Sequence, residues 1–233
     1  MALVMNANLT RPASPNLLPL GLRSSLFDGL APSEINALLA AARKRRFPPH
    51  EVIQREGEPA TGSFLLATGR AVAYKLTPEG ERVFLHWIVP GDAFGFTAPR
   101  RKPPPCVATV QTLRESLVLV WDWESSLALT SQFPQLRGNA CAAMANHLAS
   151  VSRVLVARCS QTARQRLARM LVESADQIGR TGSEGIEIDL TNEDLADMAG
   201  VSLFTASRQL SEWQRKGILA KRRGRILLHS RNV

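Results

Sequence analysis

Cysteine is scarce in this chain, and the few cysteines present exclude several kinds of site. The sequence holds three of them, Cys106, Cys141 and Cys159, and no two have a CxxC spacing. An odd number without paired spacing argues against a disulfide framework, a zinc site and a four-cysteine iron–sulfur cluster. Because disulfides are rare in reducing compartments, this cysteine usage fits a cytoplasmic protein.

Long apolar runs are missing as well. No unbroken run approaches the roughly 20 residues that span a bilayer. The first 21 residues, MALVMNANLTRPASPNLLPLG, have neither the charged start nor the clean apolar core of a signal peptide. We therefore expect no membrane contact and a flexible N-terminal arm over residues 1–24.

Acidic residues are few relative to basic ones. Lys and Arg number 29 and Asp and Glu 20, so the formal net charge is +9 and the pI about 10.5. This imbalance favours a polyanionic partner, although a basic soluble protein without such a partner has the same composition.

Residues 25–134 predict a small β domain that begins with a helix. The stretch 25–46 favours the helix, with Ser33 as its N-cap. From Phe47 to about Trp123, short apolar runs alternate with turns rich in Gly and Pro, and TPEG at 77–80 is typical of a hairpin connection. Short strands at this spacing predict a β-roll of the jelly-roll type.

Residues 135–160 predict a long helix. Apolar side chains recur at steps of three and four, and Cys141, Leu148 and Leu155 share one heptad position. One face of a helix roughly 37 Å long is hard to cover with a single small roll. We therefore predict a dimerisation helix, with packing inside its own domain as the alternative. The predicted dimer seam contains Cys141, Met144, Leu148, Val151 and Leu155.

The stretch TNEDLADMAGVSLFTASRQLSEWQRKGIL, residues 191–219, has the pattern of a helix-turn-helix. Thr191 and Ser202 can cap two successive helices, and Asp194 stands three residues after the first cap. Gly200, between the helices, suits a left-handed turn. In a helix-turn-helix the second helix enters the major groove of DNA.

A basic hairpin follows this motif. The segment ILAKRRGRILLHS predicts two strands around a turn, and residues 217–233 include five basic residues and no acidic one. Such a wing suits contacts with DNA phosphates, which depend on charge and not on sequence. Residues 161–233 therefore predict a winged helix-turn-helix, and the whole chain an α+β fold.

These motifs resemble the Crp/Fnr superfamily of bacterial transcription regulators. The resemblance extends from about Leu26 to Ser230: a roll with PGDAFGF, a long helix, the pattern LTNEDLADMAGVS…TASRQL…GIL and a wing. It implies a homodimeric cytoplasmic regulator that is not an enzyme. The implied partners are double-stranded DNA and, for an activator, RNA polymerase. The effector, the target genes and the choice between activation and repression stay open.

The resemblance also assigns residues to DNA. Family members present a glutamate, then a serine or glycine, then an arginine to the bases; the matching positions here are Phe204, Ser207 and Arg208, with Leu203 beside them. Ser207 matches the Fnr-like branch, and Arg208 can donate two bonds to guanine O6 and N7. Phe204 departs from the pattern, because a phenyl ring accepts no bond from cytosine but can pack on a thymine methyl. The expected phosphate contacts are Ser202, Thr205, Ser211, Lys221, Arg222, Arg223 and Arg225.

The roll lacks the residues that the resemblance connects with known effectors. Cyclic-AMP-binding members have a glutamate shortly after GD-x-x-G and an Arg-Ser pair further on, where this chain has Phe96, Pro105 and Cys106. Three basic residues at 100–102 are close by, but in a Pro-rich loop. The N-terminal cysteine group of cluster-binding Fnr-like members is absent too. We therefore expect neither cyclic AMP nor an iron–sulfur cluster.

Two residues of the roll stay open as sensors. His86 stands in the middle of VFLHWIV and is a candidate haem ligand, although an ordinary packed histidine fits the same position. Cys106 would be a thiol sensor if its cationic neighbours lowered its pKa. The sequence indicates no metal site and no definite cofactor.

Two other kinds of protein compete with this interpretation. A cupin-like enzyme needs histidines and carboxylates that converge on a metal, but the roll has no His-x-His pair. A protein-interaction module built on the same roll and helices does not need a basic wing. Salt-dependent binding to duplex DNA distinguishes these alternatives from a DNA-binding regulator.

Overall fold

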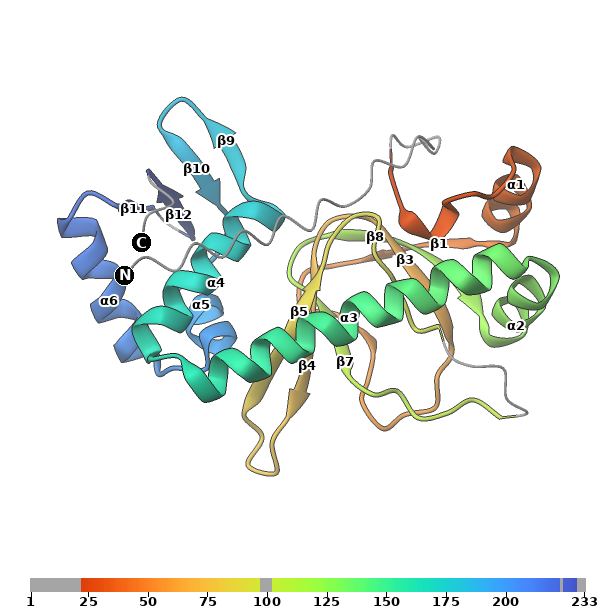
Figure 1. Cartoon of the computed structure of the whole chain (residues 1–233), viewed down its shortest axis with the longest axis horizontal. Coiled ribbons are helices and arrows are strands. Elements are labelled where there is room, and N and C mark those ends of the chain that lie inside the picture. The colour runs from red at the N-terminus through yellow and green to blue at the C-terminus, as the bar shows by residue number, and fades with distance from the viewer. Residues whose placement is uncertain (1–21, 97–101, 223, 230–233) are drawn as a thin grey trace.

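The computed structural model describes residues 22–96, 102–222 and 224–229. Most of the N-terminal arm, together with Arg100, Arg101 and Arg223, lies outside these residues. Figure 1 shows an elongated molecule with the roll at one end and the winged helix at the other. Helix α3 (Pro134–Ser160) runs from the roll towards the winged helix.

Two antiparallel four-stranded sheets build the roll, in the orders β1-β8-β3-β6 and β2-β7-β4-β5. The strands are β1 (Arg43–Phe47), β2 (Val52–Gln54), β3 (Gly62–Thr68), β4 (Ala71–Leu76), β5 (Arg82–Ile88), β6 (Ala93–Phe94), β7 (Thr109–Thr112) and β8 (Ser116–Asp122). Buried side chains of both sheets meet in one cluster, where the rings of Phe64 and Phe94 stack 5.1 Å apart. The β4–β5 hairpin closes at residues 77–80. The predicted roll is confirmed.

The helix expected over residues 25–46 is wrong in extent and in its cap. The chain forms a 3₁₀ turn, η1 (Ser25–Phe27), then α1 (Pro32–Ala41), and then continues as β1. Pro32 occupies the first turn of α1, and the carboxylate of Glu34 accepts the Ala31 N–H at 2.7 Å, so Ser33 lies inside the helix. Residues 43–46 suit a helix by local preference, but pairing with β8 makes them a strand.

The first half of helix α3 packs against η1 and α1. A short helix that the sequence did not predict, α2 (Trp123–Gln132), precedes it. Leu136 and Ala140 of α3 join a buried cluster with Leu26 and Leu38. The Asn139 amide donates to the carbonyls of residues 26 and 28 at 2.9 and 2.8 Å. The inner face of α3 is thereby fixed on the roll.

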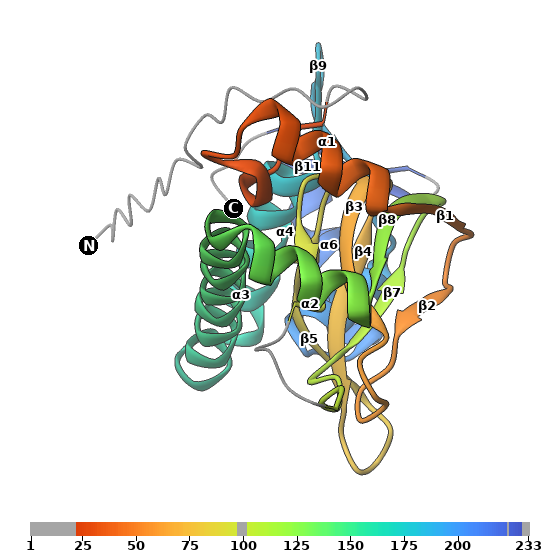
Figure 2. The same cartoon turned by 90° about the vertical axis from the view of Figure 1, so that its right-hand side faces the viewer.

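The outer face of α3 is more apolar than the search for unbroken runs indicated. The helix has 27 residues, and an 18-residue window reaches a mean hydropathy of 1.3 with 22% of it buried, so by length and composition alone it meets the requirements of a membrane span. Core helices and dimer helices pass the same test. Figure 2 shows α3 along one edge of the molecule, away from most of the sheet strands.

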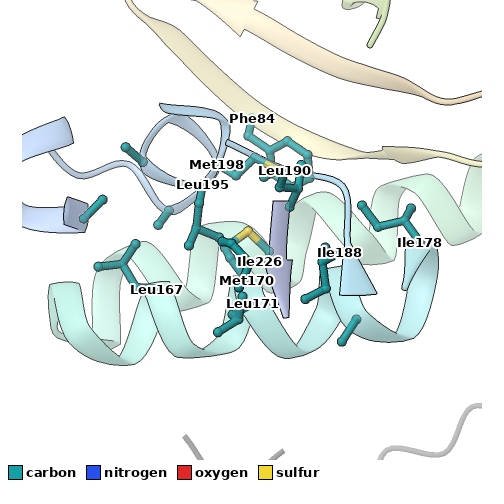
Figure 3. Close-up of a cluster of buried hydrophobic side chains, with 14 of the residues drawn as sticks. Phe84, Leu167, Met170, Leu171, Ile178, Ile188, Leu190, Leu195, Met198 and Ile226 are labelled. Carbon is teal, nitrogen blue, oxygen red and sulfur yellow. The ribbon is translucent and has the colours of Figure 1, made fainter. Parts of the chain in front are cut away.

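The C-terminal domain is a winged helix. Its elements are α4 (Ala163–Ile178), β9 (Arg180–Gly182), β10 (Gly185–Ile188), α5 (Asn192–Ala199), α6 (Leu203–Arg215), β11 (Leu219–Arg222) and β12 (Arg225–Leu228). The strands form one sheet in the order β11-β12-β10-β9. Figure 3 shows the buried core, where Leu167, Met170 and Leu171 of α4 meet Leu195 of α5. Phe84 of the roll belongs to the same cluster.

Candidate DNA-binding surface

The helix-turn-helix forms as its cap residues predict. Thr191 accepts the Asp194 N–H at 3.0 Å, and the Asp194 carboxylate accepts the Thr191 N–H at 2.9 Å. Gly200 has φ 59° and ψ 53°, the left-handed conformation that ends α5. Ser202 then accepts the Thr205 N–H at 3.2 Å and starts α6. The chain therefore turns sharply between the two helices.

Two arginines that the sequence analysis did not connect with this turn lie against it, and one of them is bonded to it. Arg166 of α4 donates from Nε to the carbonyl of Ala199 at 2.8 Å and from Nη2 to that of Gly200 at 3.2 Å. The guanidinium of Arg158, at the end of α3, lies against Gly200, where any side chain would collide with it. A single sequence carries no signal for either contact, because Ala199 and Gly200 are 33 residues or more away from these arginines along the chain.

The outer face of α6 begins with two exposed apolar side chains. Phe204 is 75% exposed and Leu203 is 51% exposed. Arg208 follows one turn later and is also exposed, while Ser207 is half-buried and accepts a weak bond from the Asn192 amide at 3.5 Å. Ala206, Leu210 and Trp213 are buried on the opposite face. The four predicted base-reading residues therefore lie on or beside one open face.

The predicted phosphate-contacting residues hold bonds within the protein. The Ser202 and Thr205 hydroxyls lie 2.9 Å apart, and Lys221 Nζ donates to the Ser211 hydroxyl at 2.9 Å. Two ion pairs cross the sheet, Arg222 with Glu184 and Arg225 with Glu187, each at 2.6 Å. The sequence analysis did not foresee these carboxylates, because their approach depends on how β10 pairs with β12.

A groove separates the start of α6 from the wing. Its lining comes from Leu190, Thr191, Asn192, Glu193, Leu203, Lys221, Arg222, Gly224 and Arg225. Apolar and cationic side chains thus share one concave surface, which matches the mixed chemistry of a DNA groove bordered by phosphates.

The predicted dimer seam lies on the uncovered side of α3. Met144, Leu148 and Leu155 are 42%, 67% and 61% exposed, and Cys141 is exposed as well. Val151 is half-buried, because it turns partly towards the body of its own chain. Val156, at 63%, is also exposed but lies about 100° around the helix from Leu155, outside the predicted seam. A continuous apolar stripe therefore runs along α3.

The roll offers little to a cyclic nucleotide at the matching positions. Phe96 is half-buried and packs against the cluster of Leu26 and Trp121. Pro105 forms a β-bridge with Pro59, and the Cys106 N–H donates to the carbonyl of residue 58 at 2.8 Å. An apolar ring, a proline and an occupied donor do not fit a phosphate or a ribose hydroxyl.

The pKa values of the two candidate sensor residues keep the Cys106 thiol protonated and the His86 imidazole neutral, which is the form of histidine that ligates a metal. Burial, and secondarily Glu58, raises the pKa of the Cys106 thiol, so the condition for a thiolate sensor is not met. His86 is stacked on His147 of α3 with ring centres 4.4 Å apart, and burial, with a smaller effect of His147, lowers its pKa to about 3. This is the geometry of a packed, neutral histidine between β5 and α3.

The described residues contain no group of three or more His, Cys, Asp or Glu side chains placed to hold a metal ion.

Two family models match the chain. Residues 44–133 match the cyclic nucleotide-binding domain, and residues 165–233 match the Crp-like helix-turn-helix domain. The first match covers the strands of the roll and the second covers the winged helix.

Several proteins are similar along most of their length. The chain is 23% identical over 197 residues to a CRP-like cAMP-activated global transcriptional regulator of Mycobacterium tuberculosis, which covers 84% of this chain and 88% of that protein. It is 26% identical over 196 residues to the cyclic AMP receptor protein of Thermus thermophilus, with the same two shares. Over 179 residues it is 25% identical to Electron transport regulator A of Shewanella oneidensis, with shares of 76% and 71%.

Solved structures share the architecture. FixK2 from Bradyrhizobium japonicum matches with a TM-score of 0.72 at 25% identity, over 82% of this chain and 93% of that one. The c-di-GMP-responsive regulator CLP of Xanthomonas campestris matches with a TM-score of 0.72 over 86% of this chain and 100% of that one, at 18% identity.

Proposed function

The chain belongs to the Crp/Fnr superfamily of transcription regulators, and from that premise we propose that it is a homodimer that binds an inverted repeat in duplex DNA. The observation that carries the proposal is the open face of α6. Leu203, Phe204 and Arg208 project from it, and the cationic wing stands beside it. Helix α6 has the width that the major groove admits.

In this proposal Arg208 recognises guanine by hydrogen bonds, and the first turn of α6 recognises thymine by apolar contact. An exposed guanidinium donates two parallel bonds to guanine O6 and N7. Phe204 and Leu203 have no polar atom in their side chains, so they contribute contact with a thymine methyl. Ser207, half-buried beneath them, accepts or donates one further bond at the groove floor.

The wing supplies sequence-independent affinity. Lys221, Arg222 and Arg225 line the groove that faces the start of α6. Phosphates attract these cations and release condensed counterions, so binding weakens as salt rises. Further hydroxyl donors to phosphates come from Ser202, Thr205 and Ser211. We also include Arg223, which stands in the basic segment KRRGR of the wing sequence.

The stripe on α3 supports the dimer. Two copies of Leu148 and Leu155, paired across a two-fold axis, would remove from water a surface that the described chain leaves open. The two α6 helices of such a dimer fall one duplex turn apart, about 34 Å, which requires an inverted repeat. Burial of α3 in this interface also accounts for its apolar composition without a membrane, in a cytoplasmic protein.

The roll, in this proposal, takes no cyclic nucleotide. The residues at the matching positions are Phe96, Pro105 and Cys106, and none of them offers a free donor to an anion. The signal that the roll transmits, if it transmits one, reaches α5 through the core that Phe84 shares with Met198. RNA polymerase is a partner if the protein activates transcription.

Selection of duplexes from a random pool by the full chain tests the function. We expect an inverted repeat with guanine at a fixed position in each half, and an affinity that falls linearly on a logarithmic salt scale. Recovery of no common sequence, or binding that is indifferent to salt, would remove the proposed function.

A further inference from the structure

We propose that α6 recognises the 5-methyl group of a pyrimidine, so that at one position of each half-site the methyl of 5-methylcytosine makes the same apolar contact as the methyl of thymine. This inference rests on the proposed function and makes it more specific. It assigns the DNA ligand a chemical mark, the methyl group at C5, and makes cytosine methylation able to strengthen a site.

The apolar pair at the start of α6 is the observation behind it. In the described part of the winged helix, Leu203 and Phe204 are the only large hydrophobic side chains that are exposed, at 51% and 75%. The other large apolar side chains of this domain are buried, as Trp213 and Leu210 are, or partly buried, as Ile186 and Ile218 are. Two exposed apolar side chains side by side mark a contact surface.

The surroundings of this pair indicate DNA as its occupant. Leu203 lines a groove together with Lys221, Arg222 and Arg225, and Arg208 is exposed one turn further along α6. Three cations and one carboxylate, Glu193, line this groove, and such an excess of positive charge favours a polyphosphate over an apolar protein surface. The occupant must therefore present an apolar group between two phosphate chains.

The major groove has one such group. Its base edges carry acceptors and amino donors, and the C5-methyl of thymine is their apolar feature. Neither Phe204 nor Leu203 can accept the N4 proton of cytosine or of 5-methylcytosine, so the two bases differ at this position only in the methyl group. 5-Methylcytosine presents the same methyl in the same place. Burial of one methyl is worth roughly four-fold in affinity.

Base analogues isolate the methyl group. In the best selected duplex, each thymine is replaced in turn by uracil, which removes the methyl and keeps every polar atom of the base. Fluorescence anisotropy with the full chain should show about a four-fold loss at one position, and about fifteen-fold when both half-sites are changed. At that position, 5-methylcytosine should bind about four-fold more tightly than cytosine.

Three variants assign the effect. Phe204→Ala should bring the thymine-to-uracil and the 5-methylcytosine-to-cytosine affinity ratios close to one, because the ring that covers the methyl is gone. Leu203→Ala measures how much Leu203 contributes to the same two ratios. Arg208→Ala is the matched control on the same helix, and it should lose the guanine preference while it keeps the thymine-to-uracil ratio. Circular dichroism verifies that each exposed-site variant folds.

The outcomes separate this inference from the proposed function. An inverted repeat that is selected normally but tolerates uracil everywhere overturns the methyl contact and leaves the function standing. A thymine-to-uracil affinity ratio that is unchanged in both Phe204→Ala and Leu203→Ala also overturns the methyl contact. If Phe204→Ala instead changes the sedimentation of the DNA-free protein, the pair belongs to a protein interface. Failure to select any sequence removes both proposals.

Discussion

Among the described residues, Arg208 on α6 has no hydrogen-bond or ion-pair partner, while Lys221, Arg222 and Arg225 near the proposed DNA-binding surface hold partners. Lys221 is bonded to a serine, and Arg222 and Arg225 pair with glutamates. A guanidinium that is exposed on the reading helix can align both donors with a base edge without breaking an ion pair first.

Arg208→Ala should therefore relax specificity at one base pair of each half-site. We expect a cost of about 1–3 kcal/mol for the preferred duplex and a selected-sequence logo that loses its guanine there. Arg215→Ala, an exposed arginine in the last turn of α6, is the control and should keep the logo. A logo that is unchanged in Arg208→Ala would assign guanine reading to another residue.

In the proposed complex, Glu187 would compete with a DNA phosphate for Arg225. The two side chains form an ion pair at 2.6 Å, in which Arg225 is 51% and Glu187 is 29% exposed. Glu187→Gln should release the guanidinium and remove a negative charge that faces phosphates. We expect tighter binding to all sequences alike, with a salt slope steeper by about one unit.

A remote substitution of equal charge controls this prediction. Glu79 is exposed in the β4–β5 turn of the roll, so Glu79→Gln makes the same change in net charge far from the wing. If Glu79→Gln strengthens DNA binding as much as Glu187→Gln does, net charge and not the ion pair is responsible.

The exposed positions of Phe204 and Arg208 on α6 could be predicted from the N-cap and the apolar periodicity of that helix. Both positions follow from Ser202 as N-cap and from Leu210 and Trp213 as the buried side of α6. Glu184, Glu187 and Arg166 could not be predicted in the same way. Their partners are 33 to 38 residues away, and only the folded sheet and the α4–α5 contact bring them together.

Helix α3 has two apolar faces: one packs against its own chain, and the other is open to a partner in the proposed dimer. Leu136, Ala140 and Ala143 pack inward, while Leu148 and Leu155 stay open. A helix with both faces apolar needs two partners, and the chain itself supplies one.

Leu148→Glu with Leu155→Glu should yield a monomer. Dimer formation would bury four unpaired carboxylates along the axis, and that desolvation outweighs the remaining contact area. Sedimentation velocity measures the state, and we expect the inverted repeat to bind no more tightly than a single half-site.

The exposed alanines of α3 provide the control for charge alone. Ala142 and Ala149 have the same seven-residue spacing but point away from the stripe. Ala142→Glu with Ala149→Glu should remain dimeric. A dimer in the leucine variant would show that another surface joins the subunits.

The local sequence pattern predicted α3 correctly, but it wrongly predicted a helix for residues 43–46, which form part of β1. The heptad spacing of Cys141, Leu148 and Leu155 requires only helix geometry, so it is visible in sequence. The run RKRRF has no alternation, and its strand state follows from pairing with Leu117–Val120 of β8. Val151 was placed in the seam by the same spacing, yet it is half-buried because the body of the chain covers one side of it.

At the scale of the whole molecule, the roll and the winged helix share one core. Tyr74, Phe84 and Trp87 of the roll belong to the same buried cluster as Met198 and Leu195 of α5. Figure 1 shows the β4–β5 hairpin reaching towards the domain that carries α6. The orientation of α6 therefore depends on the roll, which is the requirement for a signal to pass between them.

Asp189 fixes this orientation from the edge of the core. It accepts two bonds from the Arg114 guanidinium at 2.6 and 2.7 Å, and its backbone carbonyl accepts from Arg70 at 3.1 Å. The bonds from Arg114 lower the pKa of Asp189 below its ordinary value of 3.8. A lowered pKa means that the stabilisation is present at neutral pH and is lost as pH falls through the folded pKa.

Asp189→Asn should loosen the contact between the domains without unfolding either. We expect faster hydrogen exchange in β10 and α5 at neutral pH. Thermal stability should be lower than that of the unchanged chain at pH 7, and the difference should disappear as pH falls through the lowered pKa of Asp189. Glu58→Gln, which removes the exposed partner of Arg55 in the loop between β2 and β3, should leave exchange in α5 unchanged. Identical exchange in both variants would contradict the role of Asp189.

A cyclic nucleotide should neither bind the roll nor be required for DNA binding. Its phosphodiester is an anion, and burial of an anion is costly unless a cation and several donors meet it. Prolines at 103–105 remove three N–H donors, the next N–H is bonded to residue 58, and Phe96 presents a ring where a ribose needs an acceptor. Titration calorimetry with cyclic AMP at millimolar concentration should show no heat of binding, and anisotropy should give the same DNA affinity with and without it. Saturable binding in the micromolar range, abolished by Arg100→Ala or Arg101→Ala, would place the protein among the nucleotide sensors.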